Sequence, residues 1–374
     1  MRILSVFGTR PEAIKMAPLV KRLSSEPALT SRVCITGQHR EMLDQVLSLF
    51  EITPEYDLDI MQPSQDLTDI TSMILEGLRP VLIDFKPHYV LVHGDTSTTF
   101  AASLAAYYLR IPVAHIEAGL RTNNIYEPWP EEVNRKLTSV IASMHFAPTK
   151  EAEANLLKEG HKSENIFVTG NTVIDALVSV SKKIDLNESL RGEITRTFNF
   201  LTENSKVVLV TGHRRENFGI GFERICIALK KAAHMFPDVE FVYPLHLNPN
   251  VREPVRKLLA QVQNIHLIKP LDYLPFVYLM KRSSIILTDS GGIQEEGPSL
   301  GKPVLVMRDV TERPEAVNAG GVKLVGTDPQ RILNELKELL TCDKASFEKN
   351  LLNNPYGDGN ASGRIIERLL KTLA

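Results

Sequence analysis

The feature that most constrains the fold is an alternation of short apolar runs with amphipathic segments, which continues along all 374 residues. Each run is shorter than a typical helix and rich in β-branched residues, which predicts buried strands. Strands that alternate with helical segments form βαβ units, and these units build parallel sheets. The expected strands are Ile3–Phe7, Val33–Thr36, Tyr89–His93, Val113–Glu117, His145–Ala147 and Ile166–Thr169 in the first half, and Val207–Thr211, Glu240–Tyr243, Ile265–Ile268, Ile285–Thr288, Val304–Met307 and Val322–Val325 in the second.

Two sets of six strands predict an α/β protein with two Rossmann-like, doubly wound parallel-sheet domains in series. The length agrees, because about 150 residues is a common domain size. The polar stretch 181–205 is typical of a connection between domains. We expect an N-terminal domain over residues 1–170 and a C-terminal domain over 171–360, with an active-site cleft between them. The last helix, 361–374, can complete the first domain or belong to the second.

Composition excludes several kinds of partner. The net charge of −2 with 24% charged residues leaves no general basic field, so nucleic acid and membrane surfaces are not expected partners. The cysteines, Cys34, Cys226 and Cys342, are too few and scattered for a disulfide framework or a zinc cluster, which favours a reducing compartment. The N-terminus lacks a signal-peptide core, and no apolar run approaches the length of a membrane span. We therefore expect a cytoplasmic protein.

The stretch Thr288–Glu296, TDSGGIQEE, has the composition of an anion site. It joins a predicted strand to a helix expected from Ile293 through a turn at Ser290, Gly291 and Gly292. Glycines let backbone N–H groups approach a phosphate, and a helix N-terminus favours negative charge by about 0.3–1 kcal/mol. A carboxylate one turn later would be repelled by phosphate, so we expect it to bind ribose hydroxyls. The stretch can also be a plain turn followed by a solvated acidic pair.

Polar residues also follow several other strands, and in open parallel sheets ligands bind at the carboxyl ends of the strands. In the first half, Arg10 and Lys15 share a face near the start of a helix for which Pro11 can provide the first residue. Asp95, Glu117 and Glu131 are the acids of this half, and His213 follows a strand of the second half. The three acids and His213 can meet only across the expected cleft between domains.

Each candidate also has a structural interpretation. Asp95 can be a helix cap, and Glu131 can simply interact favourably with the dipole of a helix from its first turn. Glu117 at the end of an apolar strand is either paired or functional. His213 can be an ordinary loop histidine, and Arg313 can form a surface ion pair.

Several common chemistries lack their motifs. No complete GxGxxG follows a strand, so a nicotinamide site is poorly supported. The chain has no GxxxxGK[ST], HExxH, CxxC or GxSxG, which disfavours P-loop, metalloprotease, metal-thiolate and serine-hydrolase chemistry. We therefore expect an activity that needs neither a metal nor a nicotinamide.

Nine motifs, in order and with matching spacing from end to end, resemble the bacterial non-hydrolysing UDP-N-acetylglucosamine 2-epimerases. They are FGTRPEAIK (Phe7–Lys15), HGDTSTT (His93–Thr99), HIEAGLR (His115–Arg121), EPWPEEVNR (Glu127–Arg135), TGNTVID (Thr169–Asp175), TGHRREN (Thr211–Asn217), HLNPNVRE (His246–Glu253), TDSGGIQEE (Thr288–Glu296) and RPEA (Arg313–Ala316). The resemblance implies a two-domain fold of the glycosyltransferase B type, usually a homodimer. It also implies reversible conversion of UDP-GlcNAc to UDP-ManNAc, which supplies surface polysaccharides, without a cofactor.

This reaction fits the candidate residues. The proton on sugar C2 is not next to a carbonyl, so its removal is best explained by elimination of UDP to a 2-acetamidoglucal, followed by re-addition. That path needs carboxylates at the sugar and hydrogen-bond donors at the departing diphosphate. By resemblance, Asp95, Glu117 and Glu131 are the acid and base candidates, without an assignment of each to one face. His213 would act at the diphosphate as donor or general acid.

The resemblance also implies binding residues for the nucleotide. Arg10 and Lys15 would stabilise the diphosphate charge, and Glu296 rather than Glu295 would bind the ribose. Further contacts with UDP would come from Leu271 and Phe276 at the uracil, which can also be core residues, from Ser290, Gly291 and Gly292 at the phosphates, and from Arg313.

Some members of the family bind a second UDP-GlcNAc as an allosteric activator. Gln38, His39 and Glu41 lie in the matching stretch of this chain. The regulated relatives resemble each other in this stretch, because they carry glutamine at the position of Glu41. This chain therefore departs from their pattern at that position.

Three other functions fit parts of this pattern. A hydrolysing epimerase would share the first half-reaction and release ManNAc and UDP. A glycosyltransferase of the same fold would need an acceptor and has less use for three acids. A non-catalytic UDP-sugar sensor would keep 290–296 without needing the acids. The complete set of candidates in both halves favours the epimerase.

Overall fold

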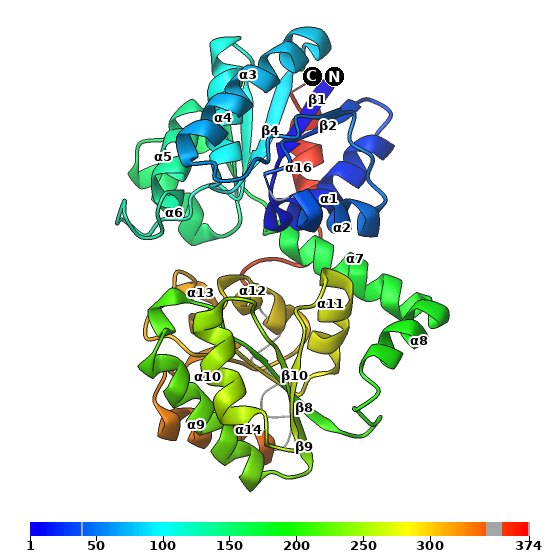
Figure 1. The fold of residues 1–374 in the computed structure, drawn as a ribbon. Coiled ribbons are helices and arrows are strands. Elements are labelled where there is room, and N and C mark those ends of the chain that lie inside the picture. The colour runs from blue at the N-terminus through cyan, green and yellow to red at the C-terminus, as the bar shows by residue number, and fades with distance from the viewer. Residues whose placement is uncertain (39, 342–353, 373–374) are drawn as a thin grey trace. The chain divides into compact units, whose positions relative to one another are not determined.

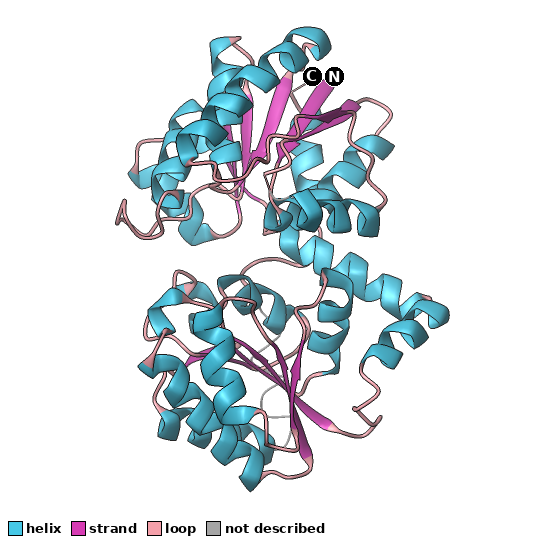
Figure 2. Ribbon diagram, in the orientation of Figure 1, coloured by secondary structure: helices cyan, strands magenta, loops and turns pink. Residues whose placement is uncertain are grey.

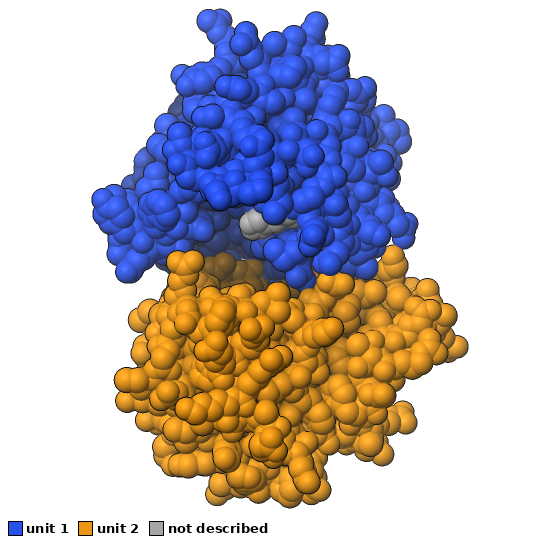
Figure 3. All heavy atoms as spheres, in the orientation of Figure 1, with its two compact units in different colours: residues 1–179, 356–374 blue, residues 180–355 orange. Residues whose placement is uncertain are grey.

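The computed structural model describes residues 1–38, 40–341 and 354–372. The chain divides into two compact units, unit 1 with residues 1–179 and 356–374 and unit 2 with residues 180–355 (Figure 3). In each unit, helices cover both faces of a parallel sheet (Figures 1 and 2). The predicted class of two Rossmann-like α/β domains is confirmed.

Unit 1 contains a seven-stranded parallel sheet with the strand order β3-β2-β1-β4-β5-β6-β7. Its strands are β1 (Arg2–Phe7), β2 (Thr30–Ile35), β3 (Tyr56–Asp57), β4 (Tyr89–His93), β5 (Val113–Ile116), β6 (Met144–Ala147) and β7 (Ile166–Val168). Its helices are α1 (Arg10–Ser25), α2 (Arg40–Phe50), α3 (Leu67–Phe85), α4 (Ser97–Tyr108), α5 (Glu131–Ile141), α6 (Lys150–Lys158), the first half of α7 (Thr172–Leu186) and α16 (Ala361–Leu370). The short edge strand β3 was not predicted, because two residues make too brief a run to stand out.

Unit 2 contains a six-stranded parallel sheet with the order β10-β9-β8-β11-β12-β13. Its strands are β8 (Lys206–Thr211), β9 (Val239–Pro244), β10 (Ile265–Ile268), β11 (Ile285–Thr288), β12 (Val304–Val306) and β13 (Val322–Leu324). Its helices are α8 (Glu188–Thr197), α9 (Ile220–Met235), α10 (Pro249–Leu259), α11 (Tyr273–Arg282), α12 (Gly291–Ser299), α13 (Pro314–Asn318) and α14 (Pro329–Thr341).

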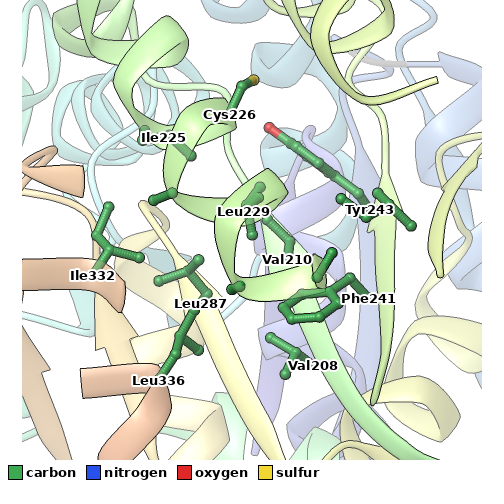
Figure 4. Packing of buried hydrophobic residues seen from close by; sticks show 14 of the residues in the cluster. Val208, Val210, Ile225, Cys226, Leu229, Phe241, Tyr243, Leu287, Ile332 and Leu336 are labelled. Carbon is green, nitrogen blue, oxygen red and sulfur yellow. The ribbon is translucent and has the colours of Figure 1, made fainter. Parts of the chain in front are cut away.

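Buried aliphatic side chains hold the helices against the sheets. In unit 2, Ile225 and Leu229 of α9 lie against Val208 and Phe241 of β8 and β9 (Figure 4). Successive side chains of a strand point to opposite faces of the sheet. The residues between those that face α9 therefore lie on the other face, which packs against α11 and α12. Burial at about 25 cal/mol per Å² makes such layers the main source of stability.

The last described helix, α16, belongs to unit 1 and packs beside α1 (Figure 1). The carboxylate of Asp175 on α7 accepts hydrogen bonds from the first backbone N–H groups of α16, at Ala361 (3.0 Å) and Ser362 (2.8 Å). The first turns of α7 therefore also belong to unit 1, and the division falls after Ser179 rather than at residue 170.

The same strand order in both sheets defines a switch point in each unit, where successive connections run in opposite directions. In unit 1 this point lies between β1 and β4, and in unit 2 it lies between β8 and β11. Ligands of doubly wound folds bind at the carboxyl ends of the strands beside this point. The loops that follow these four strands are therefore the places to examine for a site.

Candidate active site

The unit 1 switch point is formed by the loops after β1 and β4. Gly8 follows β1, and a Cβ at this position would lie 1.8 Å from the Thr36 hydroxyl oxygen, so no other residue fits without a shift. Thr9 caps α1, and its side chain accepts a hydrogen bond from the Glu12 N–H. Pro11 is consequently the second residue of α1 and not the first, as we had expected.

Glu12 links the two loops. The N–H groups of Gly8 (3.0 Å) and Thr9 (2.8 Å) donate to one of its carboxylate oxygens, and the hydroxyls of Thr96 (2.6 Å) and Thr99 (3.1 Å) donate to the other. Burial raises the pKa of Glu12, and these hydrogen bonds oppose the rise. The sequence analysis gave Glu12 no separate role, although its place three residues after a threonine is the signature of a capping box.

Glu117 lies directly after β5 and contacts three polar side chains. It forms an ion pair with Lys15, and the side-chain amide of Asn171 donates to the same carboxylate oxygen at 2.8 Å. The Nε2 atom of His93 lies 3.8 Å from that oxygen. Burial lowers the pKa of His93 to about 4, so its ring is neutral at physiological pH. Glu117 is thus paired, and Lys15, expected at the diphosphate, lies at this carboxylate.

Asp95 does not cap a helix. Thr96 is the N-cap of α4, which rules out the structural interpretation given above. The Asp95 carboxylate instead pairs with Arg135 of α5, and the side chain of Asn134 donates to the Asp95 carbonyl at 2.9 Å. Arg135 also lies 3.3 Å from the buried Glu132. The motif around residues 127–135 therefore supplies a cation that fixes one of the candidate acids.

Glu131 differs from the other two acids. It is the first residue of α5, and its Oε2 atom is buried without a hydrogen-bond partner among the residues that the structure describes. Its position in the first turn is also favourable for the helix dipole. An unpaired buried carboxyl oxygen is unusual in a folded protein and is more common at functional sites.

A pocket of about 390 Å³ brings these groups together within unit 1. Its size lies in the range of about 300–1,000 Å³ that small-molecule sites occupy. The acidic residues Glu12, Asp95, Glu117 and Glu131 and the basic residue Lys15 all line it. The pocket therefore contains the three acids that the sequence predicted and one that it did not.

The remaining candidates of unit 1 lie around this pocket. Gln38 lines it and accepts a hydrogen bond from the Thr98 hydroxyl at 3.1 Å. Arg10 is the first residue of α1 and is not among the lining residues. Glu41 is exposed in the first turn of α2, and His39 lies outside the described residues.

The unit 2 switch point is formed by the loops after β8 and β11. The hydroxyls of Thr211 and Thr288, the last residues of these strands, are 2.6 Å apart. Ser290 is the N-cap of α12, and its side chain makes no capping hydrogen bond. The helix begins at Gly291, not at Ile293 as expected, so both glycines expose N–H groups in its first turn. This is the arrangement that binds anions at helix N-termini.

Cationic side chains surround this turn. A Cβ at Gly291 would lie 3.0 Å from the Glu312 carboxylate and 3.6 Å from the Arg214 guanidinium. Arg308 also pairs with Glu312, at 2.6 Å. Burial opposes ionisation of Glu312, but Arg313 and Arg308 lower its pKa to about 2. Neither Arg214 nor Arg308 was predicted from the sequence as a site residue, although Arg214 belongs to the motif TGHRREN.

The two adjacent glutamates of α12 have different partners. Glu295 is almost fully buried, and the guanidinium of Arg313 donates to it at 2.7 Å. The hydroxyl of Tyr273 donates to Glu296 at 2.8 Å. Arg313 therefore forms an ion pair, as the structural interpretation held, but its partner is in the interior and not at the surface. Glu295 serves that pair, which leaves Glu296 as the better candidate for a ligand.

Leu271 and Phe276 flank the start of α11. Leu271 precedes the N-cap residue Asp272, and Phe276 lies in the first turn. Both side chains are only half-buried, so neither belongs to the fully buried core that was the alternative for them.

His213 follows β8 and lies beside the buried Asp289. Its Nδ1 atom is 3.4 Å from the carboxylate, and its ring stacks on that of His246 with centroids 5.7 Å apart. Burial lowers the pKa of His213, while Asp289 opposes this shift. The imidazole is thus held between a carboxylate and a second ring.

The described part of the chain has neither a membrane-spanning helix nor a metal-binding cluster. No helix in that part of the chain is long and apolar enough to cross a bilayer. Among the same residues, no cluster of three histidine, cysteine, aspartate or glutamate side chains could hold a metal ion. A larger pocket, of about 910 Å³, lies beside the first residues of the strands of unit 2 and is lined by none of the predicted site residues.

The fold and the two switch points define a class: an α/β protein of two Rossmann-like units, one with a pocket lined by acidic residues and one with a glycine-rich helix N-terminus. The family model described as UDP-N-acetylglucosamine 2-epimerase matches residues 21–370. The chain belongs to the UDP-N-acetylglucosamine 2-epimerase family.

Individual relatives are similar in sequence to this chain over nearly its whole length. The UDP-N-acetylglucosamine 2-epimerase of Escherichia coli K12 is 60% identical over 369 residues, which cover 99% of this chain and 98% of the relative. The crystal structure of the Neisseria meningitidis UDP-GlcNAc 2-epimerase bound to UDP-GlcNAc is 58% identical, covers 99% of this chain and 100% of its own, and has a TM-score of 0.92. The Methanocaldococcus jannaschii UDP-GlcNAc 2-epimerase in complex with UDP-GlcNAc and UDP is 33% identical, with coverage of 99% and 100% and a TM-score of 0.81.

Proposed function

We propose that this protein interconverts UDP-GlcNAc and UDP-ManNAc by inverting C2 of the sugar, without net hydrolysis. The observation that carries the proposal is the unit 1 pocket, in which three carboxylates predicted from the sequence converge in different states of pairing. Membership of the epimerase family supports the reaction, and the Neisseria relative bound to UDP-GlcNAc supports the substrate.

The reaction proceeds by elimination and re-addition. A base removes the C2 proton as the bond from C1 to the diphosphate oxygen breaks, which gives UDP and a 2-acetamidoglucal with a planar C2. A proton then returns to the opposite face of C2 while the diphosphate oxygen adds to C1. Positioned general acids and bases contribute about 10²–10⁴-fold each to such proton transfers.

Asp95, Glu117 and Glu131 carry these proton transfers. Asp95 is held by Arg135, and Glu117 by Lys15 and Asn171, so the side chain of each acid has a fixed position at the pocket. Glu131 has a buried oxygen with no partner in the described part of the chain, which suits a group that exchanges a proton with the sugar. The different pairing of the three acids supports a role for each in proton transfer, but it does not assign a particular acid to either face of C2.

The unit 2 site binds the nucleotide in this proposal. Ser290, Gly291 and Gly292 hold the phosphates at the start of α12, and Glu296 binds the ribose. Phe276 and Leu271 contact the uracil, and His213 acts at the departing diphosphate oxygen. Arg10 and Lys15 stabilise the charge of the diphosphate, and Arg313 provides a further contact with UDP.

The hydrolysing reaction is the principal alternative, and one experiment separates the two. Incubation of the purified protein with UDP-GlcNAc alone in D₂O should give UDP-ManNAc with one deuterium at C2. Release of ManNAc and free UDP as the main products would establish the hydrolysing activity instead. No turnover without an added acceptor would favour a glycosyltransferase, and unlabelled UDP-ManNAc would contradict proton exchange at C2.

Further proposals concern regulation, assembly and location. We expect a cytoplasmic homodimer whose product supplies surface polysaccharide synthesis. A second UDP-GlcNAc would bind as an activator beside this pocket, which Gln38 lines. Sigmoidal dependence of the UDP-ManNAc to UDP-GlcNAc rate on added UDP-GlcNAc would support activation, and its absence would reject it.

A further inference from the structure

Asp289 is a buried carboxylate to which the sequence analysis gave no role. It follows β11 at the unit 2 switch point, and its side chain is fully shielded from solvent. A carboxylate in such a place is costly unless it is paired and hydrogen-bonded. Its partners therefore indicate what it does.

Hydrogen bonds to Asp289 fix it against the loop after β8. The His213 N–H donates to both carboxylate oxygens (3.1 and 2.9 Å), and the Arg214 N–H donates to one of them at 2.9 Å. The side-chain amide of Asn217 lies 3.4 Å from the same oxygen and also donates to the Met307 carbonyl at 3.2 Å. The carboxylate thus sets the backbone conformation of the loop that carries His213.

Asp289 also faces the His213 ring. Its Oδ1 atom lies 3.4 Å from Nδ1 of the imidazole, and within residues 1–38, 40–341 and 354–372 this is the sole ion-pairing contact found for the carboxylate. The distance is long for a hydrogen bond, but such bonds often shorten when substrate binds. A carboxylate beside Nδ1 favours a proton on that nitrogen, and Nε2 is then the atom left for the ligand.

We infer that Asp289 is a positioning residue, which holds the His213 imidazole with Nδ1 protonated so that Nε2 faces the departing diphosphate. The inference rests on the proposed function for the role of His213. By this arrangement the protonated imidazole donates from Nε2 to the diphosphate oxygen as the C1–O bond breaks, and the negative charge of Asp289 stabilises the imidazolium until the proton leaves.

The other charged and titratable groups near His213 act against its protonation. Burial disfavours the imidazolium, and Arg214 and the stacked His246 add positive charge. The N–H of Asn248 donates to Nδ1 of His246 at 3.1 Å, which orients that ring. Asp289 is therefore the group that maintains the basicity of His213, and its loss should make the imidazolium harder to form.

The experiment is a histidine ¹⁵N NMR spectrum of the wild-type protein, with His213 assigned by comparison with His213→Gln, together with the kinetics of Asp289→Asn. We expect the neutral imidazole of His213 to carry its proton on Nδ1. In Asp289→Asn we expect kcat to fall roughly 10²–10³-fold, with KM changed less than about threefold. The alkaline limb of the kcat profile should move about one unit to lower pH, because a nearby carboxylate raises an imidazole pKa.

Asp175→Asn is the matched control. Asp175 is also a buried aspartate that accepts hydrogen bonds from two backbone N–H groups, and within the described part of the chain it forms no ion pair with a histidine. It should lose stability with a kcat within about threefold of wild type and an unmoved pH profile. Equal effects of the two substitutions on kcat and on the pH profile would reduce Asp289 to a structural role and overturn the inference.

The wild-type spectrum decides the question if Asp289→Asn does not fold. A neutral His213 protonated on Nε2 would overturn the inference, and one protonated on Nδ1 would support it. If the wild-type protein turned over no UDP-GlcNAc while its spectrum showed the Nδ1 proton, the proposed function would fail and the positioning of His213 by Asp289 would stand.

Discussion

Glu117 adopts a backbone conformation that few glutamates adopt. Its φ of 61° lies in the left-handed region, which costs a residue with a Cβ about 1–2 kcal/mol relative to the right-handed one. The ion pair with Lys15 and the hydrogen bond from Asn171 hold it there. Strain of this kind is concentrated at functional sites, because the surrounding contacts must fix one side-chain position. The conformation directs the Glu117 carboxylate into the pocket.

Substitution of the tyrosine whose hydroxyl donates to Glu296 tests the role of this glutamate. Tyr273→Phe removes the hydrogen bond to the Glu296 carboxylate, so this carboxylate should be held less firmly in its position. We expect the Kd for UDP to rise about 3–10-fold, since a hydrogen bond to a charged group contributes about 1.5–3 kcal/mol and part of this is recovered by water. Isothermal titration calorimetry with UDP measures the change.

Tyr278→Phe is the control on the same helix. Its hydroxyl lies 3.0 Å from the hydroxyl of Thr195 and not near α12. This substitution should leave the Kd for UDP unchanged. Similar losses in both variants would show that α11 responds to any substitution and that Tyr273 has no particular relation to Glu296.

Sequence and structure agree best for residues that follow strands. Asp95, Glu117 and His213 could be predicted because their positions relative to buried strands are fixed by local pattern. Their partners could not be predicted. Arg135 reaches Asp95 from forty residues away, 135 against 95, and Asp289 reaches His213 across the switch point. Such pairs depend on tertiary structure, which a single sequence does not encode in its spacing.

At the scale of elements, three neighbouring strands of unit 1 each bury a histidine. His93 of β4 has its pKa lowered by burial to about 4, and burial lowers the pKa of His115 of β5 and His145 of β6 to about 3. As the pH falls below 6.5, the unfolded chain binds protons at these positions and the folded chain does not. Stability is therefore complete above pH 6.5 and is lost as the pH falls toward 4.

We expect the free energy of unfolding of unit 1 to fall by up to about 1 kcal/mol per pH unit for each histidine between about pH 6 and pH 4. Hydrogen exchange of β4, β5 and β6, read by mass spectrometry, measures it. His145→Asn should reduce the pH dependence, whereas substitution of the exposed His234 on α9 should not. Stability that was constant over this pH range would show that the three rings are protonated in the folded protein.

Helix α16 gives a second prediction for an element. Ile365 is fully buried where α16 packs beside α1, and Ile365→Ala should destabilise unit 1 by about 2–5 kcal/mol through lost burial and a cavity. Faster hydrogen exchange in α1 and in residues 172–179 would show the loss. Lys371→Ala, which removes an exposed ion pair with Glu367, should change stability by less than about 1 kcal/mol.

The strands were easier to predict than their surroundings. Each of the twelve expected strands is present. Runs of β-branched residues bounded by turn residues favour strands through their local sequence. The predicted start of α12, at residue 293, is two residues later than the observed start at 291. Glycine has a low helix propensity, so Gly291 and Gly292 were expected to precede the helix, but tertiary packing can override this propensity near a helix end. The placement of α16 in unit 1 depends on Asp175 and on α1, and an amphipathic pattern alone does not name its partner.

At the scale of the molecule, both sheets have the strand order 3-2-1-4-5-6 when counted within each unit, with β7 added to the first. The sequence indicated doubly wound sheets but not these orders, because pairing between strands far apart in the chain leaves no periodic signal. The shared order matters for function, since it creates one switch point in each unit. The carboxylates occupy that of unit 1 and the anion-binding turn that of unit 2.

This separation predicts that catalysis and nucleotide binding can be damaged independently. Asp95→Asn and Glu117→Gln keep the size of the side chain and remove its charge, so each should lower kcat by roughly 10²–10⁴-fold while the Kd for UDP stays within about threefold. Glu296→Gln should instead raise the Kd for UDP by about tenfold, because a carboxylate is a stronger acceptor for ribose hydroxyls than an amide.

Calorimetry with UDP and initial rates with UDP-GlcNAc, measured on the same preparations, compare the two kinds of variant. UDP has no hexose, so its binding should report the proposed nucleotide site of unit 2 without the sugar contacts proposed for unit 1. If Asp95→Asn and Glu117→Gln weakened UDP binding as much as Glu296→Gln does, the acids of unit 1 would be part of the nucleotide site. Unchanged rates in both would mean that the proton transfers belong to other residues, and Glu131→Gln, which removes the unpaired carboxyl, would then be the variant that loses activity.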